Sequence, residues 1–172
     1  MKTDLIISDN DLILRPLARD DIEMLRSWRN QETIRNSFVF KDEITKEQQS
    51  KWYEKYSSDV TDCMFIALFE NVPIGASALY CINDVECSAE FGRLMLGDVS
   101  RRGLGLGKRI TRLTTRMGFE FLGLQRIYLE VFEENTHAFK IYEELGYRLI
   151  GHAVKNDKKV CIMEIHTYEL NQ

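Results

Sequence analysis

The chain has 172 residues, the length of one domain with a substantial core, so we expect a single domain over residues 1–172. Its hydrophobic content of 44% and charged content of 29% are ordinary for a soluble globular protein, and no apolar run approaches the roughly 20 residues of a membrane-spanning helix. A net charge of −4 argues against nucleic acid as the main partner, and an N-terminus without an apolar signal core predicts a cytoplasmic protein with no membrane partner.

The first third of the chain predicts one strand followed by two helices. Residues 11–17 have the pattern of a strand, and one of the aspartates after it can cap a helix with apolar residues spaced by three. Residues 29–38 are polar and irregular. Thr45 and Gln48 form a capping box, which predicts the start of the second helix. The apolar positions of the two helices are Ile22, Leu25, Trp28, Trp52, Tyr53 and Tyr56.

The middle of the chain predicts an antiparallel meander. Residues 63–70 and 74–82 have the composition of strands, and the Asn-Val-Pro between them is a turn signal, so we expect a hairpin. Residues 85–96 follow a second turn and form the third member of the meander.

The cysteines and histidines show no spacing typical of a metal site. Cys63, Cys81, Cys87 and Cys161 contain no Cys-x-x-Cys pair, and the three histidines have no ligand-like pairing with them. Cysteines of a cytoplasmic protein are normally reduced. We therefore expect no metal ion in this protein.

Residues 100–109, Ser-Arg-Arg-Gly-Leu-Gly-Leu-Gly-Lys-Arg, lie between the third meander strand and a periodic segment over 105–122 that predicts a helix. Alternating glycines at a helix start expose backbone N–H groups, and the helix dipole makes that end positive, which favours phosphate. The Walker and dinucleotide fingerprints both fail on spacing here. The alternative is a glycine-rich turn with a solvated basic rim.

The last third of the chain completes the sheet. Residues 125–132 alternate as a strand, residues 135–145 form a short helix, and residues 147–154 and 160–170 form an antiparallel pair around a turn. The order of elements predicts an α/β fold in three layers, with helices on both faces of a mixed, mainly antiparallel sheet of six to seven strands.

Two motifs resemble those of the GNAT N-acetyltransferases, and the resemblance spans residues 11–170. Residues 102–107 match Arg/Gln-x-x-Gly-x-Gly/Ala, and residues 135–147 match Asn-x-x-Ala-x-x-x-Tyr-x-x-x-Gly-Tyr/Phe. The resemblance implies acetyl-CoA as the cosubstrate and a small-molecule amine as the acceptor. It places the pyrophosphate on the loop of Arg102, Gly103, Leu104, Gly105, Leu106, Gly107 and Lys108.

The same resemblance assigns the thioester chemistry. An amine attacks the thioester, so its proton must be accepted, the oxyanion needs an N–H donor, and the thiolate needs an acid. Tyr142 is the implied acid, and Asn135 and Ala138 share its helix face and face the pantetheine arm. The backbone of Met95, Leu96 and Gly97 would meet the pantetheine amides as an added strand does.

Glu90 is the candidate base, since some family members carry a catalytic glutamate on the strand before the glycine loop. Many members use only water, and Glu86 is a weaker candidate. The alternative is an exposed strand carboxylate paired with Arg93 or a lysine.

The acceptor is predicted from residues 28–35. This segment is similar to that of a GNAT subgroup that contains ribosomal-protein, spermidine and amino-sugar-nucleotide acetyltransferases, most of all to the amino-sugar-nucleotide enzyme of pseudaminic acid synthesis. We therefore predict an amino-sugar nucleotide as the acceptor, bound by Trp28, Arg29, Asn30 and Arg35. Guanidinium groups suit a diphosphate, and an aromatic ring suits a base.

Four alternatives to the amino-sugar nucleotide stay open. Trp28 can fill the core while the arginines are solvated, and a non-enzymatic acetyl-CoA-binding module is possible. A polyamine acceptor would use carboxylates nearby, and a ribosomal-protein N-terminus is the third acceptor; members of the subgroup are often dimers, so a homodimer is possible. The available carboxylates are Asp20, Asp21, Glu23, Glu32, Asp42 and Glu43.

Overall fold

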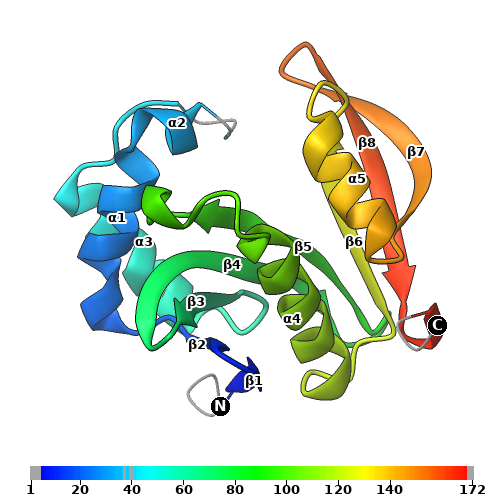
Figure 1. Cartoon of the computed structure of the whole chain (residues 1–172), viewed down its shortest axis with the longest axis horizontal. Helices are drawn as coiled ribbons and strands as arrows, with labels where there is room; N and C mark the ends of the chain where they lie inside the picture. Colours follow the sequence, from blue (N-terminus) through cyan, green and yellow to red (C-terminus); the bar gives the residue numbers. More distant parts are fainter. Residues whose placement is uncertain (1–4, 37, 39–40, 170–172) are drawn as a thin grey trace.

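The computed structural model describes residues 5–36, 38 and 41–169, and within them one eight-stranded sheet carries helices on both faces (Figure 1). The spatial order of the strands is β1 (Ile7–Asp9), β2 (Leu12–Pro16), β3 (Cys63–Phe69), β4 (Val72–Asn83), β5 (Ser88–Leu96), β6 (Arg126–Phe132), β8 (Lys158–His166) and β7 (Arg148–Lys155). Only β5 and β6 are paired in parallel. The predicted mixed, mainly antiparallel sheet is therefore confirmed.

The helices are α1 (Ile22–Asn30), α2 (Glu32–Arg35), α3 (Lys46–Ser58), α4 (Leu106–Glu120) and α5 (Thr136–Glu144). Two elements were not predicted: the three-residue β1, which adds an eighth strand, and α2, which is one helical turn inside the segment expected to be irregular. Both are too short for periodicity to reveal them. The end of the predicted strand 160–170 lies outside the described residues.

One face of the sheet packs against α4 and α5. Phe65 and Ala67 of β3 and Phe91 of β5 point to this side, where they join the buried stripe of α4 in one cluster. That stripe follows the predicted spacing of three and four residues, and its members are Leu106, Ile110, Leu113 and Met117. Full burial of each such side chain stabilises the fold by about 1.5–3 kcal/mol.

The opposite face is covered by α1 and α3. Met64 and Ile66 alternate with the residues that face α4, and they pack with Leu25, Trp28 and Tyr56. The buried residues of this second cluster come from α1 to α3, β3 to β5 and the chain just after β2. In Figure 1, β6, β7 and β8 stand apart from α1 and α3.

The parallel pair β5–β6 stays together over only three residues. Pairing ends at Glu90 and Tyr128, although both strands continue for several residues. Beyond that point β5 carries a bulge at Arg93, which has a φ of 51°, where the register with β4 shifts. A bulge bends the strand and increases its twist. The two strands therefore diverge just before the glycine loop (Figure 1).

Candidate active site

A cleft of about 540 Å³ lies where β5 and β6 have separated. Its walls are residues 94–96 of β5, the glycine loop, Thr33 and Ile34 of α2, and the side of α5 that carries Asn135, Ala138 and Ile141. The two motif segments, about 30 residues apart in the sequence, therefore border one cleft. The splayed strands make the opening, and the N-terminus of α4 closes one end of it.

The glycine loop presents backbone rather than side chains to this cleft. Gly103 and Gly105 have φ angles of +82° and +70°, in the left-handed region where a glycine carries no steric cost. Gly105 is the N-cap of α4, and within the described part of the chain no side chain caps that helix. The first N–H groups of α4 have no partner inside the helix, so this end can bind an anion. Leu104, which is 56% exposed, is the residue of the predicted loop 102–108 that does not line the cleft.

The basic residues around the loop are less available than their number suggests. Lys108 pairs with Glu144 at 2.6 Å, Arg109 with Asp11 at 2.5 Å and Arg101 with Glu70 at 3.3 Å. Arg102 donates to the hydroxyl of Thr33 at 3.0 Å. The helix N-terminus, rather than an excess of side-chain charge, is therefore the main anion-binding feature of the loop.

Asn135 lines the cleft and also stabilises the first turn of α5. It is the N-cap of α5, and its side-chain oxygen accepts a hydrogen bond from the amide of Ala138 at 3.2 Å. The predicted helix face that carries Asn135, Ala138 and Tyr142 therefore starts at the N-cap residue of α5. Ala138 lines the cleft, and Tyr142 is buried behind the wall.

Along β5, Met95 and Leu96 line the cleft as predicted, but Gly97 does not belong to its wall. The amide of Gly97 donates to the carbonyl of Ile74 at 2.8 Å, and its own carbonyl accepts from Gln31 at 2.9 Å. The indole of Trp28 lies against the Cα of Gly97, where an added Cβ would come within about 2.0 Å of the ring. Both backbone groups of Gly97 are therefore engaged within the fold, which does not favour the predicted pantetheine contact.

Tyr142 lies where the two strands part. Its ring is 6.1 Å from that of Phe91, the residue after the last paired residue of β5, and 5.9 Å from that of Tyr147. Tyr142 is 9% exposed, and burial raises its pKa to about 12. The hydroxyl therefore keeps its proton at neutral pH, which is the state that a proton donor needs.

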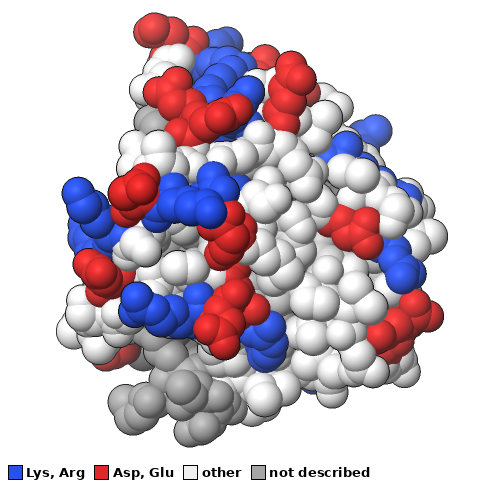
Figure 2. All heavy atoms as spheres, turned by 90° about the vertical axis from the view of Figure 1, so that its left-hand side faces the viewer, with Lys and Arg blue, Asp and Glu red and all other residues white. Residues whose placement is uncertain are grey.

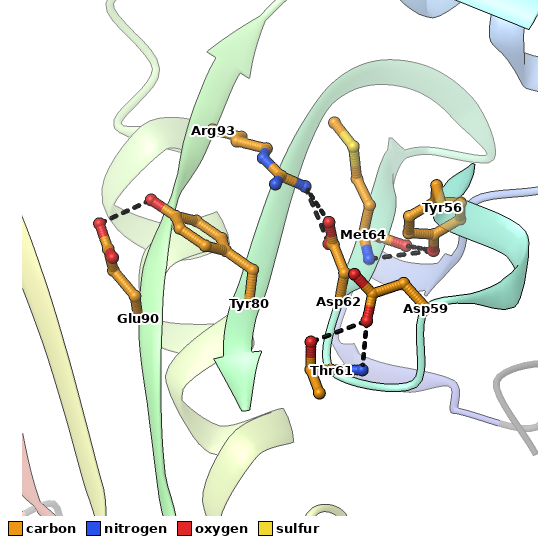
Figure 3. Close-up of polar contacts among 8 residues, drawn as sticks. All are labelled: Tyr56, Asp59, Thr61, Asp62, Met64, Tyr80, Glu90 and Arg93. Carbon is orange, nitrogen blue, oxygen red and sulfur yellow. Dashed lines mark hydrogen bonds and ion pairs between the residues drawn. The ribbon is translucent and has the colours of Figure 1, made fainter. Parts of the chain in front are cut away.

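Glu90 lies one residue before Phe91 and on the opposite face of β5. Phe91 packs toward α4, whereas Glu90 points to the face of α1 and α3, where it accepts a 2.7 Å hydrogen bond from Tyr80 (Figure 3). The expected alternative, an ion pair between Glu90 and Arg93, is wrong, because Arg93 pairs with Asp62. Tyr142 and Glu90 thus stand at the same level of the sheet, on its two faces.

Three of the four predicted acceptor-binding residues are engaged in the fold. Trp28 is only 8% exposed and belongs to the core, so it offers no stacking surface. The amide of Asn30 makes two hydrogen bonds with the backbone of Ile44, at 2.8 and 2.9 Å. Arg35 pairs with Glu43 at 3.0 Å. The alternative that Trp28 fills the core is therefore correct.

Three of the six carboxylates named above, Asp21, Glu23 and Glu43, are also paired. Asp21 binds Arg15 at 2.6 Å, and Glu23 binds Arg26 at 2.6 Å. On this side of the molecule, Figure 2 shows acidic and basic side chains next to one another rather than sorted into separate patches. The surface of α1 therefore offers no strong field to a charged substrate.

Arg29 is the predicted acceptor residue that does border a hollow. A cavity of about 430 Å³ on the α1 and α3 side is lined mainly by apolar groups, with Arg29 and Arg93 among its polar residues. Arg29 is 9% exposed, its guanidinium lies 3.9 Å from the ring centre of Phe38, and burial lowers its pKa. This acceptor-side cavity shares Phe38 and Met95 with the cleft.

Most residues of this second cavity carry no functional signal in the sequence. Its walls include Gln48, Gln49 and Trp52 of α3, together with Arg93 at the bulge. The capping box located α3 correctly, but no sequence pattern indicated that α3 faces β5. None of the helices within the described residues is long and apolar enough to cross a membrane.

Known proteins resemble this chain in sequence and in structure. Residues 11–148 match the model of the family described as "Acetyltransferase (GNAT) domain". The spermidine N(1)-acetyltransferase of Escherichia coli K12 is 27% identical in an alignment of 170 positions, which covers 94% of this chain and 90% of the relative. The acetyltransferase PseH of Campylobacter jejuni is 23% identical over 150 residues, 87% of this chain and 90% of the relative.

Solved structures of the spermidine N-acetyltransferase from Vibrio cholerae share the fold. Its complex with CoA and spermine superposes with a TM-score of 0.85 at 26% identity, covering 95% of this chain and 100% of that chain. Its dodecameric form in an intermediate state gives a TM-score of 0.77 at 27% identity, covering 92% and 95%.

Proposed function

The chain belongs to the GNAT acetyltransferase family and is an N-acetyltransferase that uses acetyl-CoA, and we propose that its acceptor is a polyamine. The observation that supports the use of acetyl-CoA is the early divergence of β5 and β6 beside an uncapped helix N-terminus. It leaves room for an extended pantetheine arm between the strands and a phosphate site at one end of the cleft.

On the cosubstrate side, the N–H groups of residues 102–108 would hold the pyrophosphate. The left-handed glycines let the chain approach the phosphates closely, as at other helix N-termini. Met95 and Leu96 of β5 would bond the pantetheine amides as an adjoining strand does. The small side chain of Ala138 leaves space for the arm along α5.

The chemistry would then proceed across β5. Glu90 accepts a proton from the amine, directly or through water, and the amine nitrogen forms a bond with the thioester carbon. As the tetrahedral intermediate collapses, the carbon–sulfur bond breaks and the thiolate takes the proton of the Tyr142 hydroxyl. The products are an N-acetylated amine and CoA, and the two residues exchange their protons with solvent. Glu90 and Tyr142 suit these roles because they lie on opposite faces at the same level.

Support for a polyamine comes first from the relatives, which are named for spermidine and spermine. A polyamine carries several positive charges and needs carboxylates. Glu90 provides one at the last paired position of β5, and Glu130 lies two residues beyond Tyr128, the β6 partner of Glu90. Glu130 also pairs with Lys155, so it would have to exchange this partner for an amine of the substrate.

A second candidate, an amino-sugar nucleotide, is favoured by one observation. The acceptor-side cavity is lined by two guanidinium groups, Arg29 and Arg93, and by none of the carboxylates in the described residues. A buried guanidinium suits a phosphate and repels a polyamine. Of the two, Arg93 is paired with Asp62. The likeness to PseH supports the same candidate.

A comparison of acceptors separates the two candidates. We would measure thiol release from acetyl-CoA with spermidine, spermine, an amino-sugar nucleotide and a peptide with a free N-terminus. The highest kcat/KM is expected for spermidine or spermine. Efficient turnover of the amino-sugar nucleotide alone would replace the polyamine by the second candidate.

The direction in which Arg29→Ala changes the KM for the acceptor also separates the two candidates. Loss of a cation should leave or lower the KM for a polyamine, whereas it should raise the KM for a diphosphate-bearing acceptor. The acetyl-CoA affinity of the variant serves as the control.

We also propose that the protein assembles into a homo-oligomer. Support comes from the dodecameric form of the Vibrio cholerae relative. Light scattering on the purified protein would give its mass, and a monomer at micromolar concentration would contradict the proposal.

A further inference from the structure

Tyr80 and Glu90 are direct neighbours across the β4–β5 ladder. They are paired in register, and the Tyr80 hydroxyl donates a 2.7 Å hydrogen bond to Oε1 of Glu90. We propose that Tyr80 is a positioning residue, which holds the Glu90 carboxylate in the orientation needed to take the proton of the attacking amine. The inference rests on the proposed function, in which Glu90 is the base.

The surroundings of Tyr80 hold its ring in one place. Gly92 leaves the space that the ring occupies, because a Cβ at that position would lie 2.6 Å from the Tyr80 hydroxyl oxygen and 3.0 Å from a ring carbon. The guanidinium of Arg93 lies over the ring, 4.5 Å from its centre. Arg93 is in turn fixed by Asp62, whose two carboxylate oxygens both accept from it at 2.8 Å. Figure 3 shows this sequence of contacts from Asp62 to Glu90.

The hydrogen bond leaves half of the carboxylate for the substrate. Among the described residues, only Oε1 of Glu90 accepts a hydrogen bond, so Oε2 stays open to an amine or a water molecule. Burial, together with the Glu90 carboxylate, raises the pKa of Tyr80 far above its usual value. Tyr80 therefore remains a donor over the working range of the enzyme, and it orients Glu90 without taking the proton itself.

Four of the groups around Glu90 do not change their charge in the acidic range. Burial raises the pKa of Cys81 on β4 and of Tyr128 on β6, and the Glu130 carboxylate raises the pKa of Lys155 on β7. The guanidinium of Arg93 is a permanent cation. The neighbouring acids are Glu130, which is ion-paired with Lys155, and Asp62, which is ion-paired with Arg93. Comparison with Glu90→Gln therefore assigns a shift in the acidic limb of the pH–rate profile to Glu90 rather than to these two acids.

The direct test is Tyr80→Phe, which removes the hydroxyl and keeps the ring. We expect kcat to fall about tenfold or more, since a hydrogen bond to a charged group is lost. The acidic limb of the kcat profile should move to higher pH by about one unit, because a carboxylate that loses a donor holds its proton more tightly. The Kd for acetyl-CoA, measured by calorimetry, should stay unchanged.

Tyr56→Phe is the matched control. Its hydroxyl is buried too, and it bonds the backbone of Met64 at 3.1 and 3.5 Å on the same face of the sheet (Figure 3). Its removal should cost comparable stability and leave the pH profile in place. A shift of the same size in Tyr56→Phe would show that the effect of Tyr80→Phe is only structural, and would overturn the inference.

A double-mutant cycle makes the inference specific to Glu90. Tyr80→Phe should lower kcat in the wild-type background and have little further effect in Glu90→Gln, because a residue that acts through Glu90 has no role without it. Equal losses in both backgrounds would overturn the proposal. If Tyr80→Phe fails to fold, Gly92→Ala displaces the same ring and should produce the same shift of the acidic limb.

These outcomes are separate from the proposed function itself. A wild-type protein that acetylates no polyamine contradicts the polyamine assignment. A wild-type protein that is active, with a Tyr80→Phe variant whose profile is unchanged, contradicts only the role of Tyr80.

Discussion

The two sides of the site differ in which atoms they offer. On the cosubstrate side, residues 102–108 present backbone N–H groups, and two glycines in the left-handed region keep side chains out of the way. On the acceptor side, residues 28–35 present polar side chains, but most of these are engaged in the core, in a backbone contact or in an ion pair. A site made of backbone depends on local geometry alone, whereas a site made of side chains depends on every partner that the fold brings near.

The largest effect should come from Tyr142, the one side chain on which the cosubstrate side would depend for its chemistry. Tyr142→Phe should lower kcat by about 100- to 10,000-fold, the usual worth of general acid catalysis, with the acetyl-CoA Kd nearly unchanged. Because burial raises the pKa of Tyr142 to about 12, no loss of wild-type activity from its ionisation is expected at neutral or mildly alkaline pH. A variant with wild-type kcat, under conditions where chemistry limits the rate, would make Tyr142 a core residue only.

Trp28 tests the acceptor side. Trp28→Ala should lower the free energy of unfolding by about 3–5 kcal/mol, because it empties a site in the core against Gly97. Denaturant titration measures the loss, and Trp28→Phe should recover part of it. If Trp28→Ala instead raised the acceptor KM with little change in stability, the indole would belong to the substrate site and the contrast between the two sides would fail.

Gly105 tests whether the loop works through its backbone. Gly105→Val places a β-branched residue at a φ of +70° and should weaken acetyl-CoA binding about tenfold or more, equivalent to 1.4 kcal/mol, as measured by calorimetry.

The matched control for Gly105 is Gly123→Val. Gly123 has a φ of +65° and open space around it, so a valine there introduces the same backbone strain outside the cleft. It should lower stability and leave acetyl-CoA affinity intact. Equal affinities for wild type and Gly105→Val would contradict a loop that binds phosphate.

The smallest effect is expected at Asn135, which lines the cleft and is also the N-cap of α5. If Asn135 serves only as the N-cap of α5, Asn135→Ala should cost about 1 kcal/mol of stability, and Asn135→Ser should restore it. The acetyl-CoA Kd of both variants would then equal that of the wild type. A Kd that rises in Asn135→Ala and also in Asn135→Ser would show that the amide contacts the pantetheine arm as well.

Most of the fold could be predicted from the sequence because its elements are long enough to show their period. The buried stripe of α4 repeats every three to four residues, and the strand at residues 63–69 was recognised from its composition. The capping box at Thr45 placed the start of α3 to the residue. The three-residue β1 and the four-residue α2 are shorter than two repeats of such a pattern, so only tertiary contacts reveal them.

The acceptor side could not be predicted in the same way. The cluster of Trp28, Arg29 and Asn30 has the composition of a binding segment, yet the helical period sends the three side chains in different directions. Trp28 packs on Gly97, which is 69 residues away in the sequence, and Asn30 bonds the backbone of Ile44. Composition says which groups a segment carries, but it does not say which of them the rest of the fold will use.

The sequence by itself determined the course of the glycine loop and the start of α4, since glycines at fixed spacing before a helix dictate the course of their own backbone. The tertiary structure decided three other features. The β5–β6 pairing ends at Glu90, and the two motifs, which are distant in the sequence, line one cleft. Tyr142 and Glu90 lie on opposite faces of the sheet. The physical reason is range: backbone conformation is set by neighbouring residues, whereas burial, pairing and protonation of a side chain are set by groups that only folding brings into contact.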